Sequence, residues 1–186
     1  MLELEGAAVC VTVGTTTELN LQDFSNQHGL GIQALTFEKT DAAVEAYRSG
    51  QCDAFTTDHS GLYAVRSSLP NPDDHIVLPN TISEEPLAPV VPHGDENWYD
   101  VVNLTMSMLI YAEAYGIDSS NVPTAVTGNS KVDRLFGLEG SFGQEAVGLS
   151  RAAAQDVIRS VGNYAEIYRR TLGDDGIGIA LSLIHI

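Results

Sequence analysis

The segment GTTTE, residues 14 to 18, places a glycine, three threonines and an acid between an apolar run and a polar segment with helical spacing. A helix that begins at such a turn exposes unbonded backbone N–H groups and a partial positive charge, and threonine hydroxyls add donors. The residues from Gly14 through Thr15 and Thr16 to Thr17 could therefore bind an anion such as a carboxylate. No lysine lies nearby and no G-K-[ST] motif follows, so a nucleotide-binding P-loop is not indicated. The competing interpretation is a helix cap, in which Thr15 or Thr16 caps the helix and Glu18 completes a capping box.

A second candidate group is Asp58, which ends the run CDAFTTD, residues 52 to 58. An acid at the C-terminal edge of an inner strand can accept hydrogen bonds from an ammonium group. By itself such an aspartate is a turn or cap residue. Together with the turn from Gly14 to Thr16, however, it provides partners for both a carboxylate and an ammonium group, and these two groups describe an α-amino acid.

The predicted elements explain how the two groups could meet. AAVCVTV, residues 7–13, is a continuous run rich in β-branched residues, as expected of a strand covered on both faces of a parallel sheet. Helical spacing then runs from Leu19 to about His28, followed by a strand at 32–38, a helix within 40–50 and a third strand at 52–58. Right-handed crossovers place the first and third strands side by side, with their C-terminal ends at one edge of the sheet. The sequence therefore predicts an α/β fold with a parallel sheet and flanking helices.

The composition limits the classes of partner. The chain has 25 acidic residues against nine lysines and arginines, which gives a formal net charge of −16. This charge repels phosphate backbones and anionic lipid headgroups, so we expect no nucleic acid and no membrane surface as partner. The length of 186 residues and the hydrophobic fraction of 44% suit one globular domain or part of a two-lobed protein. The apolar runs are too short for a transmembrane helix, and the N-terminal MLELEGAAVC is acidic where a secretory signal is basic.

The two cysteines, Cys10 and Cys52, lie on the first predicted strand and at the start of the third. Because these strands are expected to be neighbours, the two thiols could come within bonding range, and a disulfide would suit an oxidising compartment. The alternative is a pair of buried thiols that pack as small apolar residues. Geometry decides between the two, because Cα atoms more than about 7 Å apart cannot be bridged.

Several segments resemble the periplasmic solute-binding proteins of ABC transporters for polar or general L-amino acids. These segments are AAVCVTVGTTTELNL, FEKTDAAVEAYRSGQCDAFTTDHSGLYAVR, NPDDHIVLPNTISEEPLAPVV and VGNYAEIYRR, within a similarity that covers about residues 5 to 180. The resemblance implies a two-lobed periplasmic binding protein-like fold (type II) that closes on an amino acid and delivers it to an inner-membrane permease. It implies that Gly14, Thr15 and Thr16 bind the ligand α-carboxylate and that Asp58 binds its α-amino group. It further implies a periplasmic location, a monomer at full length, no cofactor and no enzymatic activity.

The resemblance also implies a domain organisation. Residues 1–86 correspond to the second, smaller ligand-binding lobe. Residues 87–180 correspond to a hinge strand around Leu87 to Val91 and an α-rich segment that packs on the first lobe. Members of the family begin with a signal peptide and that larger lobe, and neither is recognisable here, so we expect a fragment that is marginally stable or prone to aggregation when expressed alone. The helix expected from about Glu96 has an apolar face that needs such a partner, formed by Trp98, Val101, Val102, Leu104, Thr105, Met108 and Leu109.

The chain ends on LSLIHI, residues 181–186, an apolar tail that follows a loop-like segment directly. Read back into codons, it resembles the end sequence of a transposase library adapter. We interpret these six residues as an adapter-derived scar. The alternative interpretation is a natural apolar tail.

Two other functions, amino-acid sensing and lyase activity, are alternatives to transport binding. The same scaffold also hosts amino-acid-sensing domains and a few lyases. A lyase would need a further carboxylate or lysine with a perturbed pKa facing the substrate, and a regulator would need a DNA-binding module; the sequence indicates neither. Asp58, His59 and Ser60 cannot form a hydrolase triad, because adjacent residues of an extended chain point to opposite faces. The histidines lack the spacing of metal ligands, and GLEGSFGQE at 137–145 lacks the preceding strand of a nucleotide loop.

Overall fold

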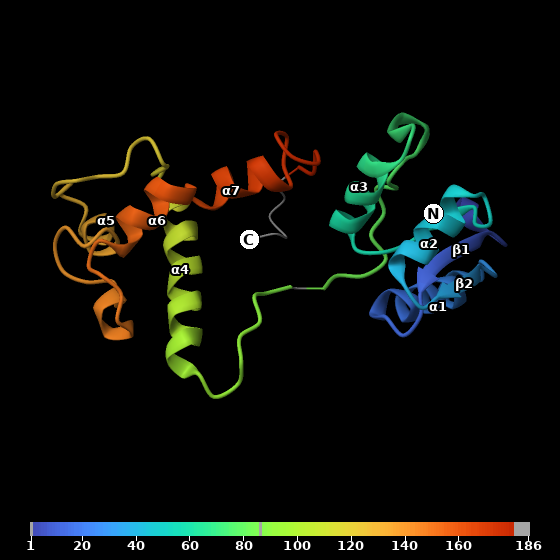
Figure 1. Ribbon diagram of the computed structural model, residues 1–186, viewed down its shortest axis with the longest axis horizontal. Helices are drawn as coiled ribbons and strands as arrows, with labels where there is room; N and C mark the ends of the chain where they lie inside the picture. Colours follow the sequence, from blue (N-terminus) through green and yellow to red (C-terminus); the bar gives the residue numbers. More distant parts are fainter. Residues whose placement is uncertain (1, 86, 181–186) are drawn as a thin grey trace. The chain divides into compact units, whose positions relative to one another are not determined.

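The structure of the protein, a computed structural model, describes residues 2–85 and 87–180 (Figure 1). Contacts between residues divide the chain into two units. The first unit contains the described residues up to 85 together with 177–179, and the second contains 87–176 and 180. The tail at 181–186, interpreted above as a scar, lies outside the described residues.

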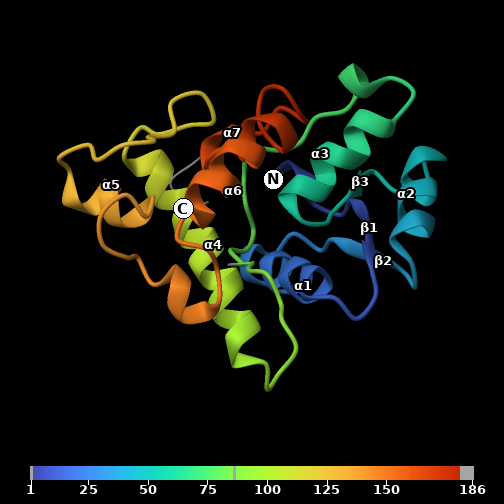
Figure 2. The same ribbon diagram turned by 60° about the vertical axis from the view of Figure 1, so that its left-hand side comes forward.

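The first unit is built on a parallel three-stranded sheet in the order β2-β1-β3. Its strands are β1 (Ala8–Thr12), β2 (Gln33–Phe37) and β3 (Ala54–Phe55). Helix α1 (Thr16–His28) covers one face of the sheet and helix α2 (Thr40–Arg48) covers the other (Figure 2). The α/β prediction is therefore confirmed, and the central strand β1 is covered on both faces, as its continuous apolar sequence indicated.

The alternation of β1 side chains produces two small cores. Val9 and Val11 pack with Leu21 of α1, and Cys10 packs with Ala43 and Ala46 of α2. These residues are buried, as successive strand residues must be when helices cover both faces of a sheet. The two cores hold β1, and therefore the turn that follows it, against both helices.

Two boundaries differ from the predicted ones. Helix α1 begins at Thr16, three residues before Leu19, because Thr15 caps the helix ahead of its apolar pattern. Strand β3 is limited to Ala54–Phe55 instead of 52–58, because helix α3 (His59–Ser68) begins soon after it. Short 3₁₀ helices, η1 (Leu2–Leu4) and η2 (Pro72–Asp74), complete the regular structure described in this unit.

The expected hinge strand at Leu87 to Val91 is not formed. These residues have no regular secondary structure, and Leu87 and Val90 are 79% and 95% exposed. A strand exists only where a neighbouring backbone pairs with it, and none of the described segments pairs with this one. The sequence pattern favoured a strand here, but it could not specify the neighbouring backbone that a strand needs.

The second unit is helical. It contains α4 (Glu96–Ala114), α5 (Ser130–Leu135), η3 (Gln144–Val147), α6 (Ala153–Val161) and α7 (Tyr164–Thr171). Its core gathers around α4 and α6, and among its most deeply buried side chains are Met108, Leu135, Phe136 and Ile158. Across residues 2–85 and 87–180, none of the helices has the length and apolarity needed to cross a bilayer.

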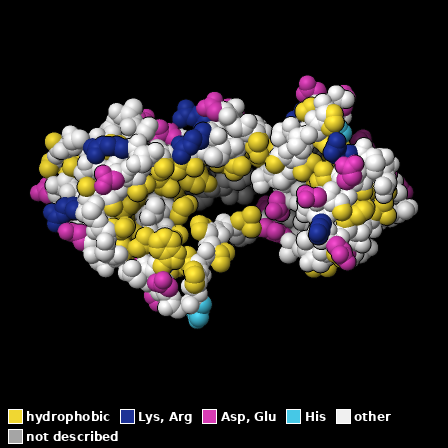
Figure 3. Space-filling model, viewed as in Figure 1, with side chains coloured by type: hydrophobic (Ala, Val, Ile, Leu, Met, Phe, Trp, Pro, Cys, Tyr) yellow, Lys and Arg dark blue, Asp and Glu magenta, His cyan; other side chains and the backbone are white. Residues whose placement is uncertain are grey.

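The apolar face predicted for α4 is covered only in part. Met108 and Leu109 are buried in the core of the second unit itself, which the sequence analysis did not anticipate. Near the start of the helix, Trp98 and Tyr99 remain 49% and 51% exposed, and Figure 3 shows hydrophobic side chains along this helix on the viewed face. The described part of the chain therefore covers the C-terminal half of the helix better than its first turn.

Candidate functional site

The turn after β1 is held by its own side chains. Gly14 has φ +72°, a left-handed conformation that favours glycine, and its N–H donates to Glu18 Oε2 at 2.7 Å. The Thr15 hydroxyl donates to the carbonyl of Thr12 at 2.7 Å and accepts from the N–H of Glu18 at 3.3 Å. Thr15 is therefore the N-cap of α1, and the carboxylate of Glu18 reaches one residue further back than in a standard capping box.

These hydrogen bonds decide which donors of the turn are free. The N–H of Gly14 is occupied by Glu18, and the proton of the Thr15 hydroxyl is occupied by Thr12. By contrast, the N–H groups of Thr15, Thr16 and Thr17 have no acceptor among the described residues, as expected for the start of a helix. The cap interpretation is thus correct for Thr15, and it leaves three successive N–H groups and the exposed hydroxyl of Thr16 available.

Asp58 lies immediately before α3, in an extended conformation with φ −53° and ψ 147°. Its backbone carbonyl accepts from the N–H of Leu62 at 2.9 Å. Its side chain is exposed, does not cap the helix, and has no hydrogen bond or ion pair among the described residues. The structure thus leaves the Asp58 carboxylate free to accept from an external donor.

The two turns follow neighbouring strands. Cys10 of β1 lies opposite Phe55 of β3, and the N–H of Thr56 donates to the Cys10 carbonyl at 3.1 Å. Since the strands are parallel, their C-terminal ends lie at the same edge of the sheet, where β1 leads into α1 and β3 into α3 (Figure 2). The topology therefore brings the turn at Gly14 to Thr16 and the residue Asp58 to one edge of the first unit.

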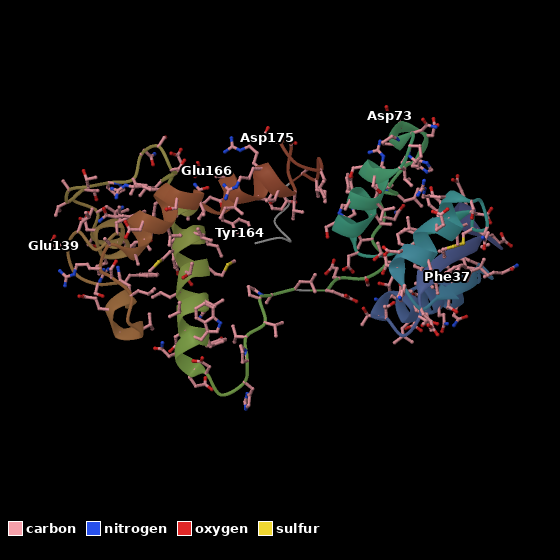
Figure 4. All side chains as sticks on the ribbon, viewed as in Figure 1. Phe37, Asp73, Glu139, Tyr164, Glu166 and Asp175 are labelled. Carbon is pink, nitrogen blue, oxygen red and sulfur yellow. A yellow bond between two sulfur atoms is a disulfide. The ribbon has the colours of Figure 1, made fainter. Side chains whose placement is uncertain are left out.

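Cys10 and Cys52 are joined by a disulfide, with their Cα atoms 5.7 Å apart (Figure 4). This separation lies within the range that a disulfide can span. Both residues are buried in the core beneath α2, together with Ala43 and Ala46. The bond links the strand that precedes the Gly14 turn to the segment that leads into Asp58.

Groups with displaced pKa values lie in the second unit. The hydrogen bond from the Thr127 backbone N–H lowers the pKa of Asp133, and hydrogen bonds from Ser120 lower that of Asp118. Burial acts to raise the pKa of Glu166, but hydrogen bonds from Ser119 and Asn163 outweigh it and the pKa is lowered. These carboxylates anchor loops and helix starts, as Glu166 does at the beginning of α7 (Figure 4), so their displaced pKa values reflect structural contacts.

Each unit has a shallow hollow on its surface. One, of about 280 Å³, is lined by residues of α2 and of the segment around Pro70 and His75. The other, of about 430 Å³, lies in the second unit between Tyr111, Tyr115, Lys131 and Phe142, among others. Neither hollow includes the Gly14 turn or Asp58. Among the residues that the structure describes, no cluster of His, Cys, Asp and Glu could hold a metal ion.

The chain is similar to several characterised binding proteins. It is 46% identical over 175 residues to the general L-amino acid-binding periplasmic protein AapJ of Rhizobium johnstonii, across 92% of this chain and 51% of that protein. It is 41% identical over 184 residues to the glutamate/glutamine/aspartate/asparagine-binding protein BztA of Rhodobacter capsulatus, across 97% of this chain and 54% of that protein. No protein-family model matches the chain.

A solved structure supports the same relationship. The chain superposes with a TM-score of 0.86 on a periplasmic binding protein of an ABC transporter from Brucella ovis, solved with glutathione bound. The two sequences are 42% identical, and the match covers 100% of this chain and 56% of the other. The chain thus spans about half the length of the relatives it matches.

The sequence indicated Thr17 as part of the anion-binding turn, but it did not indicate that Glu18 accepts from the N–H of Gly14. The signal for Glu18 was present, because an acid three residues after a capping threonine is the capping-box pattern. Which backbone N–H that acid reaches depends on the shape of the turn, and the pattern of residue types does not specify it.

Proposed function

Because the chain belongs to the family of amino acid-binding periplasmic proteins of ABC transporters, we propose that its first unit binds the α-amino-acid head group of an L-amino acid. The observation that carries this proposal is the pair of unoccupied groups at one sheet edge. Free N–H donors begin α1, and a free carboxylate precedes α3. A ligand with a carboxylate and an ammonium group on one carbon is complementary to these two groups, because its carboxylate accepts from the N–H donors and its ammonium group donates to the carboxylate.

The carboxylate of the ligand is assigned to the start of α1. The N–H groups of Thr15, Thr16 and Thr17 are unbonded and lie at the positive end of the helix dipole, where an anion is stabilised. The hydroxyl of Thr16 is a further donor. Gly14 acts in this proposal by shaping the turn, because its N–H already donates to Glu18, and the Thr15 hydroxyl is likewise used within the turn.

The ammonium group of the ligand is assigned to Asp58. A carboxylate accepts charge-assisted hydrogen bonds from an ammonium group, and these are stronger than bonds between neutral partners. The absence of any partner for this side chain among the described residues supports the assignment. A deaminated analogue of the ligand would lose this contact and keep the one at α1.

The proposed range of ligands follows from what the relatives bind. Their names include general L-amino acids and the set glutamate, glutamine, aspartate and asparagine, and the solved relative holds glutathione. Glutathione carries a free α-carboxylate and α-ammonium on its γ-glutamyl residue. One head-group site would therefore serve both L-amino acids and γ-glutamyl peptides, and the contacts to the remainder of the ligand would set the selectivity.

The same family membership supports a proposal for the whole protein. We assign residues 1–86 to the smaller lobe of a two-lobed clamp, and residues 87–180 to the segment that returns to the larger lobe. The clamp would be a monomer in the periplasm that delivers its ligand to the permease of an ABC transporter. The relatives are solute-binding proteins and not enzymes, so transport binding is favoured over a lyase or a sensing domain.

Calorimetric titration with a panel of L-amino acids and glutathione tests the proposal. Asp58→Asn should weaken binding by roughly tenfold or more, because a charge-assisted contact is lost. Asp73→Asn is the matched control, since Asp73 is an exposed acid that forms an ion pair with Arg66. Equal affinity of Asp58→Asn and the unchanged protein would contradict the assignment, and consumption of the ligand would indicate catalysis instead.

A further inference from the structure

Strand β3 is held to the sheet by few backbone contacts. It comprises only Ala54 and Phe55, each opposite one residue of β1. The backbone bonds at its two ends are the N–H of Asp53 to the carbonyl of Ala8, at 2.8 Å, and the N–H of Thr56 to the carbonyl of Cys10, at 3.1 Å. So short a ladder is a weak constraint on the position of the segment that carries Asp58.

Covalent and side-chain contacts reinforce this pairing on its N-terminal side. The disulfide joins Cys10, in the middle of β1, to Cys52, two residues before β3 begins. Oδ2 of Asp53 also accepts from the N–H of Ala8 at 2.8 Å. Both sulfur atoms belong to the buried core under α2, so the bond lies on the face of the sheet away from Leu21 and α1.

We infer that the Cys10–Cys52 disulfide is a positioning element of the amino-acid site, which fixes Asp58 relative to the N–H groups that begin α1. This inference rests on the proposed function. The two charged groups of an α-amino acid are attached to one carbon, so a single ligand reaches both partners only if their separation is constant. Loss of the bond would let the β3 segment shift against β1, and the ligand would then keep one contact at the expense of the other.

If the disulfide positions Asp58, its loss should weaken the binding of two related ligands to different extents. L-Glutamate presents the carboxylate and the ammonium group, whereas glutarate lacks the ammonium group. The dissociation constant of glutarate divided by that of L-glutamate therefore measures how much the contact with Asp58 adds to the affinity once the carboxylate is bound. In the disulfide-bonded protein this ratio should be large. In the Cys10→Ala/Cys52→Ala variant it should fall by about tenfold, equivalent to ~1.4 kcal/mol, while the affinity for glutarate changes little.

A control separates positioning from general stability. Leu21→Ala removes a buried side chain from the other face of the sheet and does not touch the link between the strands, so the ratio should be unchanged. Circular dichroism confirms that each variant is folded at the temperature of titration. If the double alanine variant is unfolded, the volume-restoring Cys10→Val/Cys52→Ala variant is measured at low temperature with sucrose, which favours the compact state.

The outcomes distinguish this inference from the proposal on which it rests. A large ratio in the intact protein that persists in a folded variant without the disulfide would overturn the positioning role and leave the head-group site standing. A ratio near one in the intact protein would overturn both. An equal fall of the ratio in Leu21→Ala would assign the effect to stability alone and would also overturn the positioning role.

Discussion

Replacement of Thr16 by proline should remove the contacts of Thr16 with the ligand, with little effect on the fold. Thr16 is the first residue of α1, the one helical position at which proline is favoured, because its N–H has no partner within the helix. The residue before a proline must be extended, and Thr15 already has φ −97° and ψ 158°. The substitution therefore removes one N–H and one hydroxyl from the proposed carboxylate site without disturbing the cap formed by Thr15.

The magnitude follows from the N–H contact that is lost; any loss from the hydroxyl adds to it and is measured separately in Thr16→Val. A hydrogen bond to a charged group contributes about 1.5 to 3 kcal/mol, so the affinity for an L-amino acid should fall roughly 10- to 150-fold. The free energy of unfolding should change by no more than about 0.5 kcal/mol, as for a surface substitution. Thr16→Val is the matched control, because it keeps the N–H and removes only the hydroxyl.

Two measurements check this reasoning. Calorimetric titration gives the affinity, and urea denaturation gives the free energy of unfolding. Unchanged affinity in a folded Thr16→Pro protein would show that the start of α1 does not bind the carboxylate. A loss of stability well above 1 kcal/mol would instead show that the Thr16 N–H has a structural role, contrary to the hydrogen bonds described above.

Three further predictions concern stability. The Cys10–Cys52 bond closes a loop with a sequence separation of 42, so loop entropy predicts a loss of about 4 kcal/mol in the Cys10→Ala/Cys52→Ala variant; a urea midpoint equal to that of the parent would contradict this. Thr15→Ala removes the cap of α1 and should cost ~1 kcal/mol in the same assay, whereas Thr17→Ala, outside the cap bonds, should cost less. The second unit should lose stability in acid, because the pKa values of Asp118, Asp133 and Glu166 are lower folded than unfolded. Their contribution is complete above the unfolded pKa of about 4 and disappears as pH falls through the lower folded values; a urea midpoint that is constant from pH 6 to pH 3 would refute it.

Helix α4 of the second unit shows which structural features the local sequence pattern predicts and which it does not. The start of α4 at about Glu96 followed from its apolar spacing, and the helix begins there, capped by Asp95. The fate of its apolar face did not follow, since Met108 is buried by the unit's own helices while Trp98 is half exposed. The spacing of apolar residues identifies a face that needs cover, but the packing of distant segments determines what covers it.

The sequence by itself determined the order of strands and helices in the first unit, because continuous apolar strands, helical spacing and right-handed crossovers leave one arrangement for β-α-β-α-β. It also identified GTTTE and Asp58 as groups that meet at one edge. Only the tertiary structure decided which donors are free, since the N–H of Gly14 and the hydroxyl of Thr15 are satisfied within the turn. It also decided the short length of β3 and the 5.7 Å separation of Cys10 and Cys52. Residue types specify the chemistry that a turn can offer, whereas the partner of each hydrogen bond depends on distances that exist only in the folded chain.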